Sequence, residues 1–137
     1  MLAAVKATAK LSLGERFVPA RFSSDAALRT IEPIAGSASD APLRSLVASG
    51  ILIGEELGLG QSLHFVFDRL AEFCTAYAYA EELGNDRTKW TSFLTRLDSA
   101  DLPAAGFRTA LALIAQTYGP KGLCPIDLPI QKAPVAP

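Results

Sequence analysis

Apolar residues recur at three- and four-residue steps along most of this chain, a spacing that predicts a series of α-helices. The longest such stretch covers residues 61–83, where the apolar positions form one wide stripe and most charged positions fall elsewhere. A helix of this length would be about 34 Å long. We therefore expect residues 61–83 to form the central helix of the core. Its apolar positions are Leu63, Val66, Phe67, Leu70, Phe73, Cys74, Tyr77 and Leu83.

Capping residues and prolines predict two helices before this stretch. Ser23 or Ser24 is placed to cap a helix over 25–31. Pro33 should end that helix, because proline keeps the residue before it out of the helical region. The second helix has a capping residue and a proline at its start and apolar positions at helical steps over residues 43–57.

Two further helices are predicted after the central one. Gly84 is suited to end the central helix because glycine readily adopts the left-handed conformation. An asparagine–aspartate pair should cap a helix over 87–98, and Asp101 should cap a last helix that a glycine–proline pair stops. The sequence therefore predicts an all-α fold, a small bundle of four to five helices over residues 25–118.

Residues 119–137 differ from this helical body because they hold five of the nine prolines. Proline lacks the backbone N–H that helices and central strands need, so the segment should be an extended arm. Its apolar residues suit an arm that lies on its own bundle or on a neighbouring protein, since pre-extended chain loses less entropy on docking. A solvated tail is the alternative. The candidate protein-interaction residues are Leu123, Ile126, Leu128, Ile130 and Val135.

Residues 1–24 are basic and amphipathic. They carry four basic residues and one acid, a net charge of +3, whereas the remaining 113 residues have a net charge of −4. A basic, hydroxyl-rich, acid-poor start is typical of a mitochondrial transit peptide, and Arg21-Phe22-Ser23-Ser24 is similar to sites at which such presequences are cut. We therefore expect a mitochondrial location. The alternative is the basic first helix of a protein from the bacterial cytoplasm.

The composition is that of a globular domain with some apolar surface to cover. Half of the 137 residues are hydrophobic and 20% are charged. The net charge of −1 gives no overall attraction to nucleic acid. Mean hydropathy is +0.25, which suggests that a partner covers part of the surface. No apolar run approaches the roughly 18–20 residues of a membrane span, so we expect no span and leave peripheral membrane association open.

The residue pattern offers little catalytic chemistry. His64 is the only histidine, and Asp68 is its one acidic neighbour at helical spacing, which makes the two the sole acid–base candidate. The sequence has no nucleophile elbow, zinc-hydrolase motif, di-iron motif or phosphate-binding glycine loop. Cys74 and Cys124 fit no zinc motif and define no disulfide framework. We therefore expect a protein that is not an enzyme and that holds no metal or cofactor.

One predicted helix has a basic edge that supports a different function. Arg87, Lys89 and Arg96 lie beside Trp90 and Phe93, and basic side chains interleaved with aromatic ones can contact phosphates. This edge would suit a small helical subunit of a bacterial ribonucleoprotein. The two aromatic residues are more simply core residues, and three basic side chains are few for a nucleic-acid surface.

The combined features favour an accessory or structural subunit of a larger assembly, with other protein subunits as its partners. The reasons are the missing catalytic set, the hydropathy, the apolar proline-rich arm and the presequence-like start. With a presequence, a mitochondrial respiratory-chain complex or ATP synthase is the natural candidate.

Overall fold

The computed structural model describes residues 2–35, 40–57, 60–100, 104–121 and 130. Within these residues the chain forms six α-helices, two short 3-10 helices and a three-stranded antiparallel sheet. The elements are, in chain order, α1 (Leu2–Leu13), η1 (Gly14–Arg16), β1 (Phe22–Ser23), α2 (Ser24–Ala35), α3 (Ala41–Ala48), β2 (Leu52–Leu57), β3 (Gly60–Phe65), α4 (Asp68–Leu83), α5 (Arg87–Asp98), α6 (Ala105–Tyr118) and η2 (Gly119–Lys121).

The prediction of an all-α bundle is wrong, because residues 52–65 contain a β-hairpin. Strands β2 and β3 pair antiparallel, with Leu52 opposite Phe65 and Gly54 opposite Leu63. The short strand β1 adds to the other side of β3, which gives the strand order β1-β3-β2. The fold is therefore mixed α/β and mostly helical.

An alternation with a period of two explains why the hairpin forms. Leu63 and Phe65 are buried, whereas His64 between them is partly exposed, because successive residues of a strand point to opposite faces. The sequence predicts one helix over 61–83 where the structure has β3 followed by α4. The apolar residues of the strand also fit the helical spacing, so the pattern does not separate the two elements. The second predicted helix likewise ends at Ala48; a turn follows, and residues 52–57 of its expected length form β2.

The helix ends were predicted more accurately than the sheet. Helix α5 has the predicted bounds, and the Asp86 carboxylate accepts a hydrogen bond from the Lys89 backbone N–H at 3.2 Å. Ser23 Oγ accepts a hydrogen bond from the Ala26 N–H at 3.1 Å in the same way at the start of α2. Pro33 does not end α2, because a proline in the last turn removes only one helical hydrogen bond.

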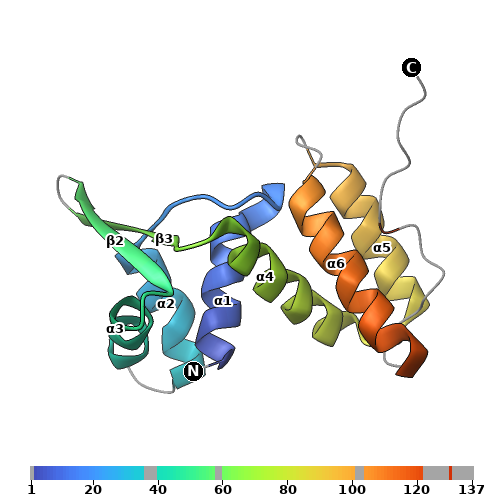
Figure 1. The fold of residues 1–137 in the computed structure, drawn as a ribbon, viewed down its shortest axis with the longest axis horizontal. Coiled ribbons are helices and arrows are strands. Elements are labelled where there is room, and N and C mark those ends of the chain that lie inside the picture. Colours follow the sequence, from blue (N-terminus) through green and yellow to red (C-terminus); the bar gives the residue numbers. More distant parts are fainter. Residues whose placement is uncertain (1, 36–39, 58–59, 101–103, 122–129, 131–137) are drawn as a thin grey trace.

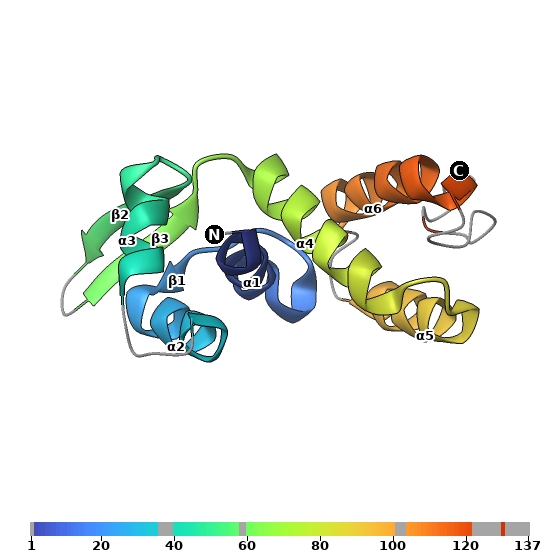
Figure 2. The same cartoon turned by 90° about the horizontal axis from the view of Figure 1, so that it is seen from below.

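Helix α4 joins two ends of the molecule (Figure 1). The sheet lies at one end with α2 and α3, and α5 and α6 lie at the other. Helix α1 lies between them and packs against α4 and α2 (Figure 2). The inner face of the sheet contributes Phe22, Leu63 and Phe65 to the same hydrophobic core that these helices share.

Four aromatic rings from four segments meet in the core. Phe17 directly follows η1 and is 1% exposed. Its ring centroid lies 5.0 Å from that of Phe107 on α6, 5.7 Å from that of Phe93 on α5 and 6.0 Å from that of Tyr79 on α4. Aromatic pairs at such separations contribute about 0.5–1.5 kcal/mol each beyond their burial. The segment 1–24 therefore supplies a core residue whose ring meets rings of three helices, α4, α5 and α6.

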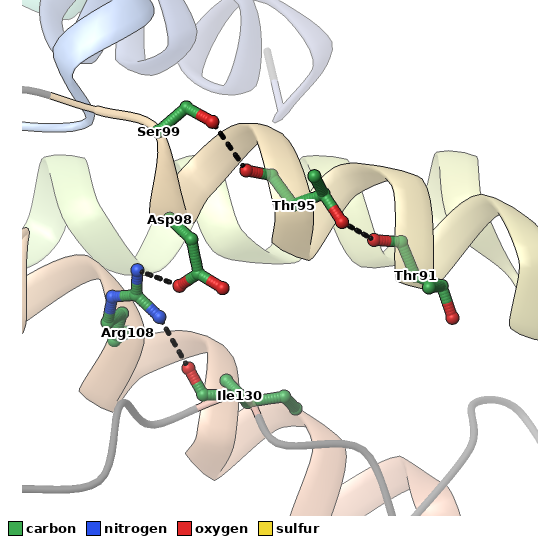
Figure 3. A network of polar contacts seen from close by, with 6 residues as sticks. All are labelled: Thr91, Thr95, Asp98, Ser99, Arg108 and Ile130. Carbon is green, nitrogen blue, oxygen red and sulfur yellow. Dashed lines mark hydrogen bonds and ion pairs between the residues drawn. The ribbon is translucent and has the colours of Figure 1, made fainter.

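A buried arginine connects the C-terminal segment to the helices (Figure 3). Arg108 on α6 donates one hydrogen bond to the Asp98 carboxylate at 2.7 Å and another to the backbone carbonyl of Ile130 at 3.2 Å. Ile130 is buried in the hydrophobic core of its own chain. The other predicted interaction residues of the arm, which lie outside the described residues, are Leu123, Ile126, Leu128 and Val135.

Candidate protein-binding groove

An open groove of about 360 Å³ lies between α4 and α6. Phe73 of α4 and Leu113 of α6 both line it, and their exposed fractions are 47% and 52%. Scattered exposed apolar residues are normal in proteins, but two large ones on neighbouring helices beside one groove form a surface patch. The other lining residues are Arg69, Glu72, Ala105, Gly106, Thr109 and Ala110.

Gly106 allows a carboxylate to lie close to the start of α6. A side-chain carbon at this position would lie 1.8 Å from Oε2 of Glu72, so any larger residue would displace the glutamate. The first turn of a helix carries backbone N–H groups without helical partners. The groove therefore has apolar walls at Phe73 and Leu113 and a polar end at Glu72.

The position of Glu72 affects its ionisation. Partial burial raises the pKa of Glu72 above its ordinary value of 4.5, because burial disfavours the charged form. The carboxylate of Asp68 raises this pKa further, whereas Arg69 acts in the opposite direction.

Glu72→Gln is expected to weaken the dependence of stability on pH above pH 4.5. The native state holds the Glu72 proton more tightly than the unfolded chain does, so its contribution is complete below pH 4.5 and is lost as the pH rises through the raised pKa. The unfolding free energy of the variant should therefore fall less between pH 4.5 and neutral pH. Urea denaturation at a series of pH values measures this.

Gly106→Ala provides a matched test of the same effect. The added methyl group displaces the Glu72 carboxylate, which is the free end of a flexible side chain, towards solvent. This variant should change the pH profile in the same direction as Glu72→Gln. Profiles that match the wild type in both variants would contradict the assignment.

The structure separates the two acid–base candidates. His64 lies in β3, whereas Asp68 is the first residue of α4, so the two do not share a helix face. His64 Nδ1 is buried and has no hydrogen-bond partner among the described residues. Glu55, on the same face of the sheet, pairs with Arg21 at 2.6 Å, and this hydrogen bond and charge lower the pKa of Glu55. His64 and Asp68 therefore do not form the candidate acid–base pair on one helix face.

The cysteine and metal-ligand chemistry of the described residues is sparse. Cys74 is a half-buried free thiol on α4. Burial raises the pKa of Cys74, with Lys6 acting in the opposite direction, and a thiol that stays protonated is a poor nucleophile. No three His, Cys, Asp or Glu side chains in the described ranges are grouped to hold a metal ion. Cys124 lies outside those ranges.

The three basic residues proposed to contact nucleic acid do not form one surface. All are exposed on α5, but Arg87 and Lys89 are two residues apart and therefore point to opposite sides of the helix. Arg96 lies two turns further along, over three aromatic rings of the core. Trp90 and Phe93 are buried in that core.

The sequence pattern identified the groove residues incompletely. The sequence pattern puts Phe73 in the apolar stripe of the expected central helix, whereas the structure leaves about half of it exposed. The sequence pattern does not single out Leu113. It falls outside the buried stripe that Phe107, Leu111 and Ile114 form on α6, and a large apolar residue in such a position was the available signal.

Comparison with known proteins assigns no family to the chain. No family model, curated protein or solved structure matches it. Among the helices that the structure describes, none is long and apolar enough to cross a membrane.

Proposed function

We propose that the protein is a non-catalytic subunit that binds another protein through the groove between α4 and α6. The observation that carries the proposal is the pair of half-exposed side chains, Phe73 and Leu113, beside this groove. Full burial of such a side chain contributes about 1.5–3 kcal/mol, so covering the exposed half of each contributes roughly 1 kcal/mol. A partner seated here gains that free energy without displacing any element of the fold.

An amphipathic helix of the partner fits the groove best. The small side chains of Ala105 and Thr109 on α6 are exposed in the groove and permit close approach of another backbone. Phe73 and Leu113 provide apolar walls for anchor residues at three- and four-residue spacing, which is how helices bind in grooves. Arg69 and the nearby glutamate offer one charge of each sign to the polar face of the partner.

The setting that we propose is a larger assembly, with a mitochondrial respiratory-chain complex or ATP synthase as the candidate. Because the segment 1–24 contains α1, η1 and β1, we further propose that the working protein retains it. N-terminal sequencing of the native protein, with identification of co-purifying proteins, tests both points. The ribonucleoprotein alternative gains little support from α5, because Arg87 points away from Lys89 and Arg96, which leaves two basic side chains on one face.

Phe73→Ser combined with Leu113→Ser is expected to abolish both binding of a hydrophobic dye by the isolated protein and capture of the native partner. The substitutions remove the apolar walls but leave the buried core intact. Ile34→Ser is the matched control, since Ile34 is 49% exposed but lies on α2, away from the groove. Dye fluorescence, sedimentation velocity and co-purification measure the effect.

Measurements on the wild-type protein alone can contradict the proposal. An isolated chain that is monomeric at micromolar concentration and binds no hydrophobic dye would contradict the proposal. Equal losses in the control and in the double variant would assign the effect to general surface hydrophobicity and would equally contradict it.

A further inference from the structure

A second groove, which shares no lining residue with the first, lies where the C-terminal half of α1 meets α2, α4 and the end of α5. Its volume is about 780 Å³, within the range of roughly 300–1,000 Å³ that is typical of small-molecule sites. Its polar lining residues are Lys10, Glu15, Thr30, Tyr79, Arg96 and Ser99. Apolar lining comes from Ala7 and Leu11 of α1 and from Ala100, two residues after the end of α5.

Arg96 is held in this groove by aromatic rings. Its Cζ atom lies 5.2 Å from the ring centroid of Phe93, 5.6 Å from that of Phe17 and 5.7 Å from that of Tyr79. A guanidinium carries five N–H donors, and its contacts with the rings pair none of them with an acceptor oxygen. Within the described residues no carboxylate pairs with Arg96. The rings therefore orient a planar cation whose donors are available.

A second cation lies beside the same ring. Lys10 Nζ is 4.5 Å from the ring centroid of Tyr79 and forms an ion pair with Glu82 at 2.5 Å. The Glu82 side chain is 57% exposed, so water screens its interaction with Lys10. Two cations beside one ring suit a dianion better than a carboxylate, which a single arginine can satisfy. The lining residues alone, Lys10, Arg96 and Glu15, carry one net positive charge, which the Glu82 carboxylate on Lys10 offsets until a ligand displaces it.

We propose that this groove binds the phosphate group of a small phosphorylated molecule. Arg96 donates two parallel hydrogen bonds to the phosphate, and Lys10 acts as a point charge on a remaining oxygen. The alanine and leucine side chains of the groove contact the apolar part of the ligand. The site is independent of the α4–α6 groove, so its test does not depend on the proposed protein partner.

Titration of the full chain with inorganic pyrophosphate tests the site. Isothermal titration calorimetry and the ¹⁵N resonances of arginine Nε should both report saturable binding to the wild type. Arg96→Gln should weaken the affinity tenfold or more, about the effect expected for a lost bidentate pair, and Arg96→Lys should give an intermediate loss. Acetate should bind more weakly than pyrophosphate, because it can engage only one of the two cations.

Lys89→Gln is the control, since it removes the same charge from the same helix outside the groove. It should leave pyrophosphate affinity unchanged. Thermal unfolding of each variant shows whether it is folded. If Arg96→Gln does not fold, Arg96→Lys still tests the site. Absence of saturable binding up to about 10 mM pyrophosphate would overturn the proposal, since a dissociation constant above this concentration is too weak for a specific site. Equal affinities in the wild type and both Arg96 variants would also overturn it.

Discussion

Removal of residues 1–22 is expected to leave a chain that does not fold cooperatively. The deletion removes α1, which packs against both α4 and α2, together with Leu13, Phe17 and Phe22 of the core. Burial of a side chain of this size contributes about 1.5–3 kcal/mol, whereas a whole domain is stable by only about 5–15 kcal/mol. Near-ultraviolet circular dichroism and urea denaturation should show neither fixed tertiary structure nor a sigmoidal transition.

Deletion of residues 131–137 is the control at the other end of the chain, because it leaves Ile130 and its hydrogen bond with Arg108 in place. That variant should unfold at close to the wild-type urea concentration. A chain without residues 1–22 that unfolds as cooperatively as the wild type would show that this segment is dispensable. It would then be compatible with a presequence that is cut after import.

Phe17→Ala is expected to destabilise the protein by about 3–5 kcal/mol, the usual cost of truncating a buried phenylalanine. The ring is fully enclosed and contacts the rings of Tyr79, Phe93 and Phe107, so the cavity would open where α4, α5 and α6 meet. The residue also has a left-handed backbone with φ of 57°, which alanine does not relieve. Urea denaturation gives the change directly.

Phe73→Ala provides the matched comparison for the same chemical change. Its ring is 47% exposed on α4, so its truncation should cost less than about 1 kcal/mol. A loss at Phe17 of the same size as the loss at Phe73 would contradict the view that the N-terminal segment supplies a central core residue.

Much of the helical part of this fold was predictable from the chain, because caps and glycines act locally. Asp86 and Gly84 mark the ends of α5 and α4 through hydrogen bonding and backbone conformation alone. The hairpin was not predictable in the same way. Leu63 and Phe65 satisfy strand alternation and helical spacing at once, and only pairing with β2 and packing on the core decide between them.

The candidate groove was less accessible from the sequence than the fold. Exposure of Phe73 depends on how α6 lies against α4, which follows from tertiary packing rather than from the pattern within α4. The same holds for the second groove. The sequence places Arg96 on a basic edge of one helix, but its ring contacts involve Phe17 and Tyr79, which are distant in sequence.

A photoreactive phenylalanine analogue at position 73, introduced into the full chain in its native cells, tests the proposed function most directly. Irradiation should produce one discrete adduct with another protein, and peptide mapping should place the cross-link on an amphipathic helix of that partner. The same analogue at position 34, which is similarly exposed on α2, should not produce that adduct. No adduct at position 73, or the same set of adducts from both positions, would contradict the proposal that this groove is where the protein binds its partner.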